Sequence, residues 1–471
     1  MITRSPNEFE KSKAQSPDLI DEIKAGLVAI LGDRISDEEA IRRHHSKDEA
    51  YHTAMPHLVA FPNSASEVSS IVSLCNEFRF PLIPWGAGSS LEGNAVPVQG
   101  GLCLDMSNMN RILRIDADDH TATVEAGVRR KQLNHELRHT GLQFPIDPGA
   151  DATLGGMAAT RASGTNAVKY GTMRENVLYA TVVSADGSIM KTRSRAPKSS
   201  AGYDLTGLLV GSEGTLGVIT DLALKLYPIP DSIITLVCTF DSIPSAIEVV
   251  ISAMHYDVSF SRVEFLDGSM MAAIAVFQKQ AFSALPTLMV EFAGHKASTQ
   301  HARDQFSEIL CSAGGEIISS ADTQEERSIL WKIRHNALYA AINLAPGKRA
   351  LITDVCIPLS SLSDCIVETR KDLDNSRFEA MIVGHVGDGN FHTFILIDPK
   401  SNEDILEAEA LHKKIAERAI AMDGTCTGEH GIGIGKRELL IKELGKSVSL
   451  MRTIKDALDP HGIFNPGKLF M

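Results

Sequence analysis

The sequence predicts an α+β fold, and two stretches of the chain carry that prediction. Between residues 80 and 226, short apolar runs such as GLCLDMS and TATVEAG alternate with glycine-rich turns, which is typical of many short strands around a few helices. After YPIPDS (227–232), the patterns follow the order strand, helix, strand, strand, helix, which predicts a two-layer, ferredoxin-like arrangement. Helical patterns precede the first stretch and return near the end of the chain.

A chain of 471 residues is too long for one ordinary core, so more than one domain is expected. The two prolines of YPIPDS mark a domain boundary. We therefore expect a helical N-terminal segment, a first α+β domain, a second α+β domain, and a C-terminal segment that returns to the first domain. The expected bounds of these segments are 1–54, 55–229, 230–425 and 426–471.

The composition excludes several classes of protein. Lysine and arginine number 46 against 59 aspartates and glutamates, and the net charge of −13 argues against nucleic acid as the main partner. No apolar run reaches the roughly eighteen residues that a membrane span needs, and residues 1–19 lack the apolar core of a secretory signal. The seven cysteines include no C-x-x-C pair, so reduced thiols of a cytoplasmic protein are expected.

Local patterns predict the elements in order. Before the glycine-rich stretch, DEEAIRRHHSKDEAYH is charged and helix-prone, and SASEVSSIVSLCNEF begins with a serine cap before apolar residues at helical spacing. After YPIPDS, the segments SIITLVCTF, SRVEFLD and LPTLMVEFAG have the composition of strands. IPSAIEVVISAMHYD and STQHARDQFSEILCSAG have helical spacing.

Three glycine-rich runs lie in the first α+β domain: PWGAGSSLEGNA (84–95), DPGADATLGGMAATRASGTNAVKYGTMRENV (147–177) and GYDLTGLLVGSEGTLGVIT (202–220). In the first run, glycines let the backbone approach a ligand closely, and consecutive amides can form a cradle for phosphate oxygens. A tight glycine turn is an equally good interpretation of that run alone, and its spacing matches neither G-x-G-x-x-G nor a Walker loop. Three such runs in one domain favour a cofactor of dinucleotide size.

GHVGDGNFH (384–392) predicts a hairpin that carries two histidines. Asp388-Gly389 flanked by apolar residues is typical of a two-residue type I′ turn, in which both turn residues have positive φ. That turn would place His385 directly opposite His392 on one face of the hairpin. The pair is either a metal site or a polar pair on a solvent-facing sheet, and the residues alone leave both interpretations open.

A candidate carboxylate ligand occurs in TGEHGIGIGK (427–436), where Glu429 precedes His430. Two histidines and one carboxylate, with positions left open, are a standard ligand set for a catalytic divalent metal. Adjacent residues of a strand point to opposite sides, so one of this pair would ligate while the other faces the substrate. A zincin helix is excluded, because the sequence contains no H-E-x-x-H.

Arg334 lies in WKIRHNALYAAI (331–342), a segment of helical period that is otherwise largely apolar and aromatic. An arginine at the surface or in an ion pair is the ordinary interpretation. An arginine that binds a substrate carboxylate is the alternative.

In combination, the three glycine-rich runs, the H-x-G-D-G-N-x-H hairpin, GEHGIG (428–433) and DPHGIFNPGK (459–468) resemble the FAD-linked oxidases of the vanillyl-alcohol oxidase/p-cresol methylhydroxylase type. Within that family, the chain is similar to the branch of D-lactate dehydrogenases (cytochrome), D-2-hydroxyglutarate dehydrogenases and glycolate oxidase large subunits. RHNALYAAINLAPGKRALITDVCIPLS (334–360) resembles the D-lactate dehydrogenases in particular. The motifs occur in the order typical of the family.

The resemblance implies an FAD-binding domain of two subdomains, with the PWGAGSS loop on the pyrophosphate, and a cap domain that binds substrate. Some relatives attach FAD covalently through a histidine in the first loop, and Ser89 at that place implies non-covalent FAD. The FAD-binding residues that the resemblance implies are Pro84, Trp85, Gly86, Ala87, Gly88, Ser89, Ser90, Pro148, Gly149, Thr153, Gly155, Gly156, Ala159, Ser163, Gly164, Glu213, Ile219 and Asn465.

The resemblance also implies the residues of the reaction. His385, His392 and Glu429 would bind a divalent metal, zinc or manganese. Arg334 would bind the substrate carboxylate, and His430 would take the hydroxyl proton. The implied reaction oxidises a D-2-hydroxy acid, first of all D-lactate, to the 2-oxo acid, with a hydride passed to FAD. The electrons would then pass to a cytochrome, a quinone or an electron-transfer flavoprotein.

The sequence leaves alternatives open for the substrate, the class of protein and its location. Lactate-type relatives often carry tryptophan where this chain has Leu338, which favours a larger D-2-hydroxy acid. Hydroxyglutarate-type relatives carry lysine where this chain has Ile352, which disfavours a second carboxylate. A flavin subunit of a glycolate oxidase-type complex, a metal-dependent hydrolase and a non-catalytic nucleotide-binding module rank below the dehydrogenase. A homodimer is left open, and the expected location is the cytoplasm, with attachment at the periphery of the inner membrane as the alternative.

Overall fold

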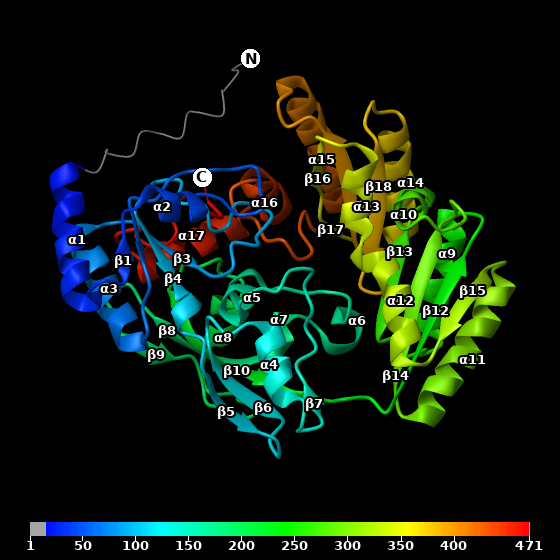
Figure 1. Ribbon diagram of the computed structural model, residues 1–471, viewed down its shortest axis with the longest axis horizontal. Helices are drawn as coiled ribbons and strands as arrows, with labels where there is room; N and C mark the ends of the chain where they lie inside the picture. The colour runs from blue at the N-terminus through cyan, green and yellow to red at the C-terminus, as the bar shows by residue number, and fades with distance from the viewer. Residues whose placement is uncertain (1–15, 471) are drawn as a thin grey trace. The chain divides into compact units, whose positions relative to one another are not determined.

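The computed structural model describes residues 16–470, which form helices and sheets throughout and confirm the predicted α+β class (Figure 1). The chain divides into two compact units. Unit 1 contains the chain up to Ala162, the segment Thr172–Pro228 and the chain from His430 onward. Unit 2 contains Ser163–Gly171 and Ile229–Glu429. The chain therefore changes unit inside YPIPDS and again between Glu429 and His430.

The first sheet of unit 1 has four short strands in the order β1-β2-β4-β3. Strands β2 and β3 run parallel to β4, and β1 is antiparallel to β2. All residues of β2 and β4 are buried, as expected for apolar runs in a parallel sheet. The elements of this part are α1 (Pro17–Leu31), β1 (Ile35–Ser36), α2 (Glu39–His44), β2 (Leu58–Ala60), α3 (Ala65–Phe78), β3 (Leu82–Trp85), β4 (Leu102–Asp105) and the 3₁₀ helix η1 (Met106–Asn108).

The second sheet of unit 1 is antiparallel, with the strand order β5-β6-β10-β8-β9. Its long strands β8 and β10 are almost wholly buried, because helix α5 covers β10 and helix α3 covers β8. The strands are β5 (Ile112–Asp116), β6 (Thr121–Glu125), β8 (Val177–Val183), β9 (Ile189–Lys191) and β10 (Val218–Lys225). Strands β7 (Leu142–Gln143) and β11 (Tyr227–Pro228) form a separate antiparallel pair. The helices are α4 (Arg130–Leu137), α5 (Leu154–Thr160), α7 (Met173–Asn176) and α8 (Leu205–Leu209).

The C-terminal segment completes unit 1 with the helices α16 (Arg437–Leu444) and α17 (Ser447–Leu458). The segment that follows α17 extends the first sheet, because Leu82 donates its amide to the carbonyl of Ile463 and accepts from the amide of Asn465, both at 2.8 Å. Phe464 is fully buried as a result. The final part of the chain is therefore an integral part of the core of unit 1.

Unit 2 is built on one large antiparallel sheet with the order β15-β12-β14-β13-β18-β19-β16, to which β17 adds on β19. The sheet is larger than the ferredoxin-like core expected from the first strands and helices after YPIPDS. Its strands are β12 (Ser232–Thr239), β13 (Arg262–Leu266), β14 (Thr287–Gly294), β15 (Glu316–Ala321), β16 (Arg349–Ile352), β17 (Val355–Cys356), β18 (Ala380–His385) and β19 (Asn390–Ile397).

The helices of unit 2 cover this sheet. One group packs on the sheet through a buried set of side chains that we call the apolar cluster: Val237, Leu266, Met270, Met271, Ala273, Ile274, Met289, Trp331, Ile333, Ala337, Ala340, Ala341, Met381, Val383, Phe394 and Leu396. This group comprises α10 (Gly268–Gln278), α12 (Gln324–His335) and α13 (Ala337–Leu344). The other helices are α6 (Ala167–Tyr170), α9 (Ile243–His255), α11 (Lys296–Ser312), α14 (Leu359–Asp374) and α15 (Asn402–Ala421).

Strands β18 and β19 place the two predicted histidines on the face that carries the apolar cluster. In β18 the cluster includes Met381 and Val383, and in β19 it includes Phe394 and Leu396. Since alternate residues of a strand share a face, His385 follows the first pair and His392 precedes the second on that same face. The site therefore begins where the apolar face of the sheet ends.

The predicted two-residue turn of this hairpin is wrong. His385 pairs with Asn390 and His392 pairs with Val383, so the loop has four residues, Val386–Gly389, and the two histidines are diagonal neighbours. Only Gly389 has positive φ (84°) in this loop, whereas a type I′ turn needs positive φ at both central residues. The register is set by β17, because Cys356 pairs with Asn390 and the amide of Ile357 donates to the carbonyl of Gly389 at 3.0 Å.

Residues 163–171, which the sequence analysis assigned to the first domain, belong to unit 2, where Arg262 donates to the amide oxygen of Asn166 at 2.9 Å. Within residues 16–470, no helix is both long and apolar enough to cross a membrane.

Candidate active site

Three predicted metal ligands of unit 2 lie together. One ligand atom from each of His385, His392 and Glu429 falls within 4.8 Å of the other two. Glu429 Oε1 lies 3.5 Å from His385 Nε2 and 3.2 Å from His392 Nε2. The rings of the two histidines are 5.5 Å apart and nearly perpendicular, so their Nε2 atoms converge on the carboxylate rather than stacking.

Glu429 is positioned by a buried aspartate. Asp354 follows β16 and is fully buried, and its Oδ2 accepts from the amide of Glu429 at 3.0 Å and from the hydroxyl of Thr427 at 2.7 Å. Its Oδ1 accepts from the side-chain amide of Asn390 at 2.8 Å. One carboxylate thus ties the loop that carries Glu429 to the hairpin that carries the histidines.

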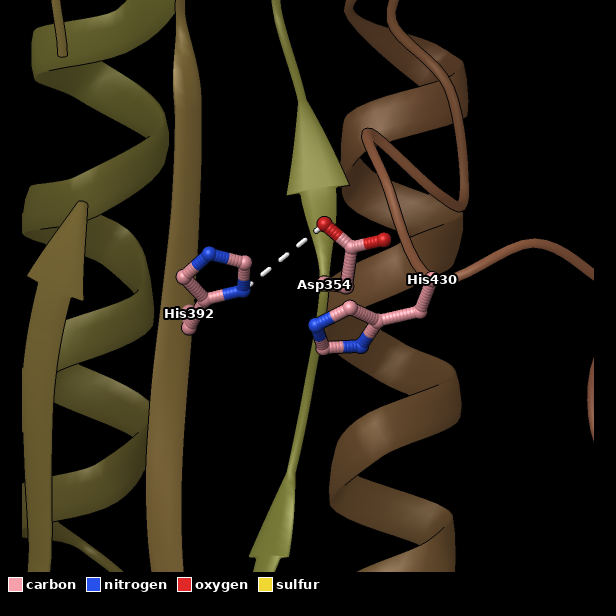
Figure 2. Close-up of side chains that lie close together, drawn as sticks. All are labelled: Asp354, His392 and His430. Carbon is pink, nitrogen blue, oxygen red and sulfur yellow. Dashed lines mark ion pairs between the residues drawn. The ribbon is translucent and has the colours of Figure 1, made fainter. Parts of the chain in front are cut away.

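The orientation of His392 follows from its Nδ1 contacts. Nδ1 lies 3.1 Å from the carbonyl oxygen of Thr353 and 3.7 Å from Asp354 Oδ1, and Figure 2 shows the His392 ring with the dashed line to Asp354. A carbonyl oxygen can only accept, so Nδ1 carries the proton. Nε2, which lies near Glu429, is therefore the nitrogen left to bind a metal, which is the usual arrangement of a histidine metal ligand.

A second carboxylate, Glu264 of β13, lies behind His385. It is fully buried, and its Oε1 is 2.5 Å from His385 Nδ1. Its Oε2 accepts from Arg334 Nε at 2.6 Å, and the Arg334 side chain is 15% exposed. The structure therefore places Arg334 in a buried ion pair that reaches the histidine cluster through a single glutamate.

The charges of this cluster favour a cation at its centre. Burial works to lower the pKa of His385, but Glu264 and Glu429 outweigh it and raise that pKa well above its usual value. Burial works to raise the pKa of Glu429, but the two histidines hold it well below its usual value. For Glu264 as well, burial is outweighed by His385 and Arg334, and the pKa is lowered. Two neutral imidazole nitrogens and one carboxylate oxygen fit a divalent metal that would take the place of the His385 proton.

The first glycine-rich run forms an open loop in unit 1. Gly86 to Ser90 follow β3 as a half-buried segment whose side chains are no larger than serine. Gly88 has φ +63°, and a Cβ on Gly86 would lie 2.4 Å from the hydroxyl of Thr153, so both positions need glycine. A loop of this kind presents its own amides and fits the phosphate oxygens of a dinucleotide cofactor.

The three glycine-rich runs meet within unit 1. Thr153 caps α5 by accepting from the amide of Gly156 at 3.3 Å, and the same hydroxyl faces Gly86 of the first run. The third run meets the second because the amide of Glu213 donates to the carbonyl of Ala159 at 2.8 Å. The gathering of the runs is what a single large cofactor requires.

The other residues of the expected FAD set lie as follows. Trp85 is buried with its ring 4.9 Å from that of His45. The side chain of Asn465 donates to the carbonyls of Asn94 and Glu213 at 2.8 and 2.7 Å. Unit 1 holds Pro84, Trp85, Gly86, Ala87, Gly88, Ser89, Ser90, Pro148, Gly149, Thr153, Gly155, Gly156, Ala159, Glu213, Ile219 and Asn465, whereas Ser163 and Gly164 belong to unit 2.

The two predicted catalytic residues lie in different units. Arg334 belongs to unit 2, and His430 is the first residue of the C-terminal segment of unit 1. Within unit 1, His430 Nδ1 lies 3.9 Å from Glu92 Oε1. The chain passes from a candidate metal ligand to the candidate base in one peptide bond.

Sequence reasoning missed Glu264 and Asp354 as parts of the site. The signal for Glu264 is a carboxylate in the centre of SRVEFLD, a strand that is otherwise apolar around it. A strand buried on both faces rarely tolerates such a residue unless it is paired. Asp354 had no comparable signal, because an aspartate after a short strand is common in turns.

Comparison with known proteins identifies the family. Residues 229–469 match the family described as FAD linked oxidases, C-terminal domain, and residues 56–193 match an FAD binding domain. The chain therefore belongs to the FAD-linked oxidases, and its cofactor is FAD.

Similar proteins agree with this assignment. The probable mitochondrial D-lactate dehydrogenase of Danio rerio is 46% identical over 96% of this chain and 92% of its own length. The mitochondrial D-lactate dehydrogenase [cytochrome] of Arabidopsis thaliana is 44% identical over 95% of this chain and 80% of its own length. A solved structure of p-cresol methylhydroxylase with substrate bound shares the fold, with a TM-score of 0.81 at 18% identity over 97% of this chain and 98% of that one.

Proposed function

We propose that this FAD-linked oxidase converts a D-2-hydroxy acid, D-lactate before others, to the 2-oxo acid. The proposal is supported by the names of the relatives and by the cluster of His385, His392 and Glu429 in unit 2, with Arg334 joined to it through Glu264. A 2-hydroxy acid has a carboxylate and a hydroxyl on neighbouring carbons. A guanidinium and a divalent-metal site close to one another are suited to those two groups.

In the proposed reaction, Arg334 binds the substrate carboxylate through its Nη atoms, since its Nε donates to Glu264. His385, His392 and Glu429 would hold a divalent metal, zinc or manganese, which would lower the pKa of the substrate hydroxyl as a Lewis acid. An imidazole nitrogen of His430 takes the hydroxyl proton, because a histidine can accept a proton near neutral pH. FAD supplies the hydride acceptor when bound.

We propose the three glycine-rich runs as the FAD site. The loop from Gly86 to Ser90 would hold the pyrophosphate, and the segments around Gly156 and Ile219 would contact the flavin and the adenosine. Ser89 at the place of the histidine used by covalent relatives supports non-covalent binding. Boiling or acid treatment should therefore release free FAD, which a filtration assay detects.

The electron acceptor is proposed to be a cytochrome, because relatives from Arabidopsis thaliana and Saccharomyces cerevisiae carry that word in their names. A quinone or an electron-transfer flavoprotein is the alternative, and reduction of each by the enzyme with D-lactate decides among them. We also propose the cytoplasmic location expected from the sequence. The relatives named above are mitochondrial proteins, so a mitochondrial location is the alternative.

The first experiment is an anaerobic visible spectrum of the purified protein before and after D-lactate, with L-lactate and D-2-hydroxyglutarate in parallel. We expect the yellow flavin to be bleached by D-lactate and to be unchanged by L-lactate. Bleaching by neither acid would contradict the proposed substrate class. Removal of metal with a chelator should abolish bleaching by D-lactate while leaving the flavin spectrum intact.

A larger D-2-hydroxy acid is the second candidate substrate. Leu338 is only half-buried against the apolar cluster, at the place where lactate-type relatives often carry tryptophan. Ile352 also packs against this cluster, at the place where hydroxyglutarate-type relatives carry lysine. These two positions favour a longer apolar side chain over a second carboxylate, and faster bleaching by D-2-hydroxybutyrate or D-2-hydroxyisocaproate than by D-lactate would select it.

A further inference from the structure

Glu264 is a buried carboxylate whose two oxygens each serve a different functional residue. It is 0% exposed in β13, between Val263 and Phe265, which are also buried. Oε1 lies 2.5 Å from His385 Nδ1, and Oε2 lies 2.6 Å from Arg334 Nε. A buried carboxylate without such partners would be strongly destabilising, so both contacts are required for its presence in the sheet.

The strand register explains why Glu264 meets His385. Strands β13 and β18 are antiparallel, with Phe265 opposite Gly384 and Leu266 opposite Val383. One step further along the same register, Glu264 stands opposite His385. The two side chains share the face that carries the apolar cluster, so their contact is set by the backbone rather than by flexible side chains.

The contact fixes which nitrogen of His385 is available. A carboxylate can only accept, so Nδ1 carries the proton that points to Glu264. The other nitrogen, Nε2, then faces Glu429 at 3.5 Å and is the atom at which a metal can replace a proton. A histidine whose Nδ1–H is held by a carboxylate binds metal in a defined tautomer and ring orientation.

The same glutamate orients Arg334. A guanidinium is planar, and a hydrogen bond from Nε fixes the plane and leaves the two Nη groups on the opposite edge. That edge can form a bidentate contact with a second carboxylate. Because His385 and Arg334 are held by two oxygens of one carboxyl group, their relative position is set by Glu264.

We propose that Glu264 is a positioning residue of the active site, which aligns the metal-binding nitrogen of His385 with the carboxylate-binding edge of Arg334. This inference rests on the proposed function, because it assigns a metal to His385 and a substrate carboxylate to Arg334. It predicts that metal affinity and substrate affinity are linked through a residue that touches neither ligand. Loss of Glu264 should therefore weaken both.

The neighbouring strand offers a matched control. Glu291 of β14 is also buried, and its Oε2 accepts from Trp331 Nε1 at 2.8 Å and from the hydroxyl of Thr235 at 3.0 Å. Its Oε1 lies 3.7 Å from Arg262. Glu291 therefore resembles Glu264 in burial and in its contact with α12, but its partners are residues other than His385 and Arg334.

The test compares Glu264→Gln, Glu264→Asp and Glu291→Gln with the unaltered holoenzyme. The amide that Glu264→Gln introduces keeps one accepting oxygen, so one of His385 and Arg334 loses its acceptor, and both lose the negative charge that holds them. We expect Glu264→Gln to weaken metal binding about 10- to 100-fold, the range seen for partners of metal ligands, and to raise KM for D-lactate about 10-fold or more. Metal affinity is measured by chelator titration with zinc or manganese, and KM by steady-state kinetics.

The control and the conservative variant decide between positioning and mere stability. Glu291→Gln should lower Tm by about as much as Glu264→Gln does. It should leave metal affinity and KM within about twofold of wild type, since Glu291 contacts neither His385 nor Arg334. Glu264→Asp keeps the charge, so we expect it to recover part of the metal affinity that Glu264→Gln loses. If Glu264→Gln does not fold, Glu264→Asp carries the test, with weaker metal binding and higher KM than Glu291→Gln as the expected result.

Unchanged metal affinity and unchanged KM in a folded Glu264 variant would overturn the proposal. Equal losses in the Glu264 and Glu291 variants would also overturn it, because they would show a general effect of removing a buried charge. Failure of the proposed function has a different signature. In that case the wild-type flavin is not bleached by any D-2-hydroxy acid, while the chelator titration still reports whether Glu264 controls the metal site.

Discussion

Glu213 in unit 1 and Glu264 in unit 2 are both buried glutamates, but their carboxylates contact different kinds of partner. Glu213 accepts from the amides of Ile432 and Gly433 at 2.7 and 2.8 Å and from the side chain of Asn94 at 2.8 Å. None of these donors titrates, and burial raises the pKa of Glu213 despite them. Glu264 instead contacts a histidine and an arginine, whose charges lower its pKa although burial opposes this.

The difference separates a carboxylate held by amides from one held by side chains that titrate. The donors of Glu213 are two backbone amides and one side-chain amide, and they attach the C-terminal segment to the rest of unit 1. The partners of Glu264 are side chains with a second task, since each has another edge that can hold a ligand. A buried carboxylate with titratable partners is therefore a better indicator of a functional site than burial alone.

The largest expected effect is the loss of a metal ligand from unit 2. His392→Ala should remove bound metal and lower kcat/KM about 1,000-fold, because several kcal/mol of transition-state stabilisation would be lost. FAD content should stay at the wild-type level, since His392 is not among the expected FAD-binding residues, most of which belong to unit 1. Metal analysis and steady-state kinetics check this, with His301→Ala on the exposed side of α11 as the control. A His392→Ala protein with wild-type kcat/KM would contradict the proposed metal role.

The converse change removes the amide-held carboxylate of unit 1, Glu213. Glu213→Ala leaves three buried donors without their acceptor and should lower the free energy of unfolding by about 3–4 kcal/mol. Metal content per molecule should not change, because the metal ligands are in unit 2. Urea unfolding followed by flavin fluorescence, together with metal analysis, measures both quantities. Glu136→Ala, an exposed change in α4, serves as the control. Equal destabilisation by the two variants would show that the buried contacts of Glu213 do not stabilise unit 1.

Arg334→Lys tests the edge that Glu264 leaves available. Lysine keeps the charge but cannot donate to Glu264 and hold a carboxylate in a bidentate contact at once. We expect KM for D-lactate to rise about 30-fold, which corresponds to about 2 kcal/mol, with a smaller change in kcat. Arg303→Lys in α11, where Arg303 pairs with Asp304, is the matched control. A lower kcat at constant KM would argue against carboxylate binding by Arg334.

The smallest effect concerns a buried carboxyl group of unit 1 and depends on pH. Burial raises the pKa of Asp48 to about 6 from 3.8, and its Oδ2 has no hydrogen-bond partner within the described chain. A group with a raised pKa in the folded state contributes stability below its unfolded pKa, and this stability is lost as pH rises through the folded pKa. Wild type should therefore lose stability between about pH 4 and pH 6.

Asp48→Asn should abolish this loss, because asparagine does not ionise. Above pH 6 the variant should gain about 1–2 kcal/mol over wild type, less than the roughly 3 kcal/mol of a two-unit shift, since the buried amide also lacks a partner. Urea midpoints at several pH values measure the difference, and it should change sign towards about pH 4, where only the cost of the buried amide remains. A constant difference at all pH values would show that Asp48 does not titrate in this range.

Much of the fold could be predicted from the sequence because its signals are local. Strand-like composition identified β12, β13 and β14 of unit 2, and helical spacing identified α9 and α11. The number of glycine-rich runs in one domain predicted a cofactor of dinucleotide size, and the contacts between the runs came from the structure alone. The hairpin turn was predicted wrongly, because the local preference of Asp388-Gly389 is overridden by pairing with β17, which lies more than thirty residues earlier in the chain.

The candidate site shows the same limit. His385, His392 and Glu429 could be grouped because each stands in a distinctive motif. Glu264 could not, since its role depends on a register between β13 and β18 that joins residues as far apart in the chain as Phe265 and Gly384. Tertiary pairing of this kind leaves no mark in a single strand beyond one charged residue among apolar neighbours.

The split of unit 1 along the chain has a consequence for biosynthesis. Leu82 pairs with Ile463 and Asn465, and Glu213 accepts from residues 432 and 433 and from Asn94. Contacts over such separations form late, because the ribosome must first release the intervening segment. Unit 2 is already complete when residue 429 has emerged. The nascent chain can therefore finish its second unit before its first, and completion of unit 1 would await residues 432–465.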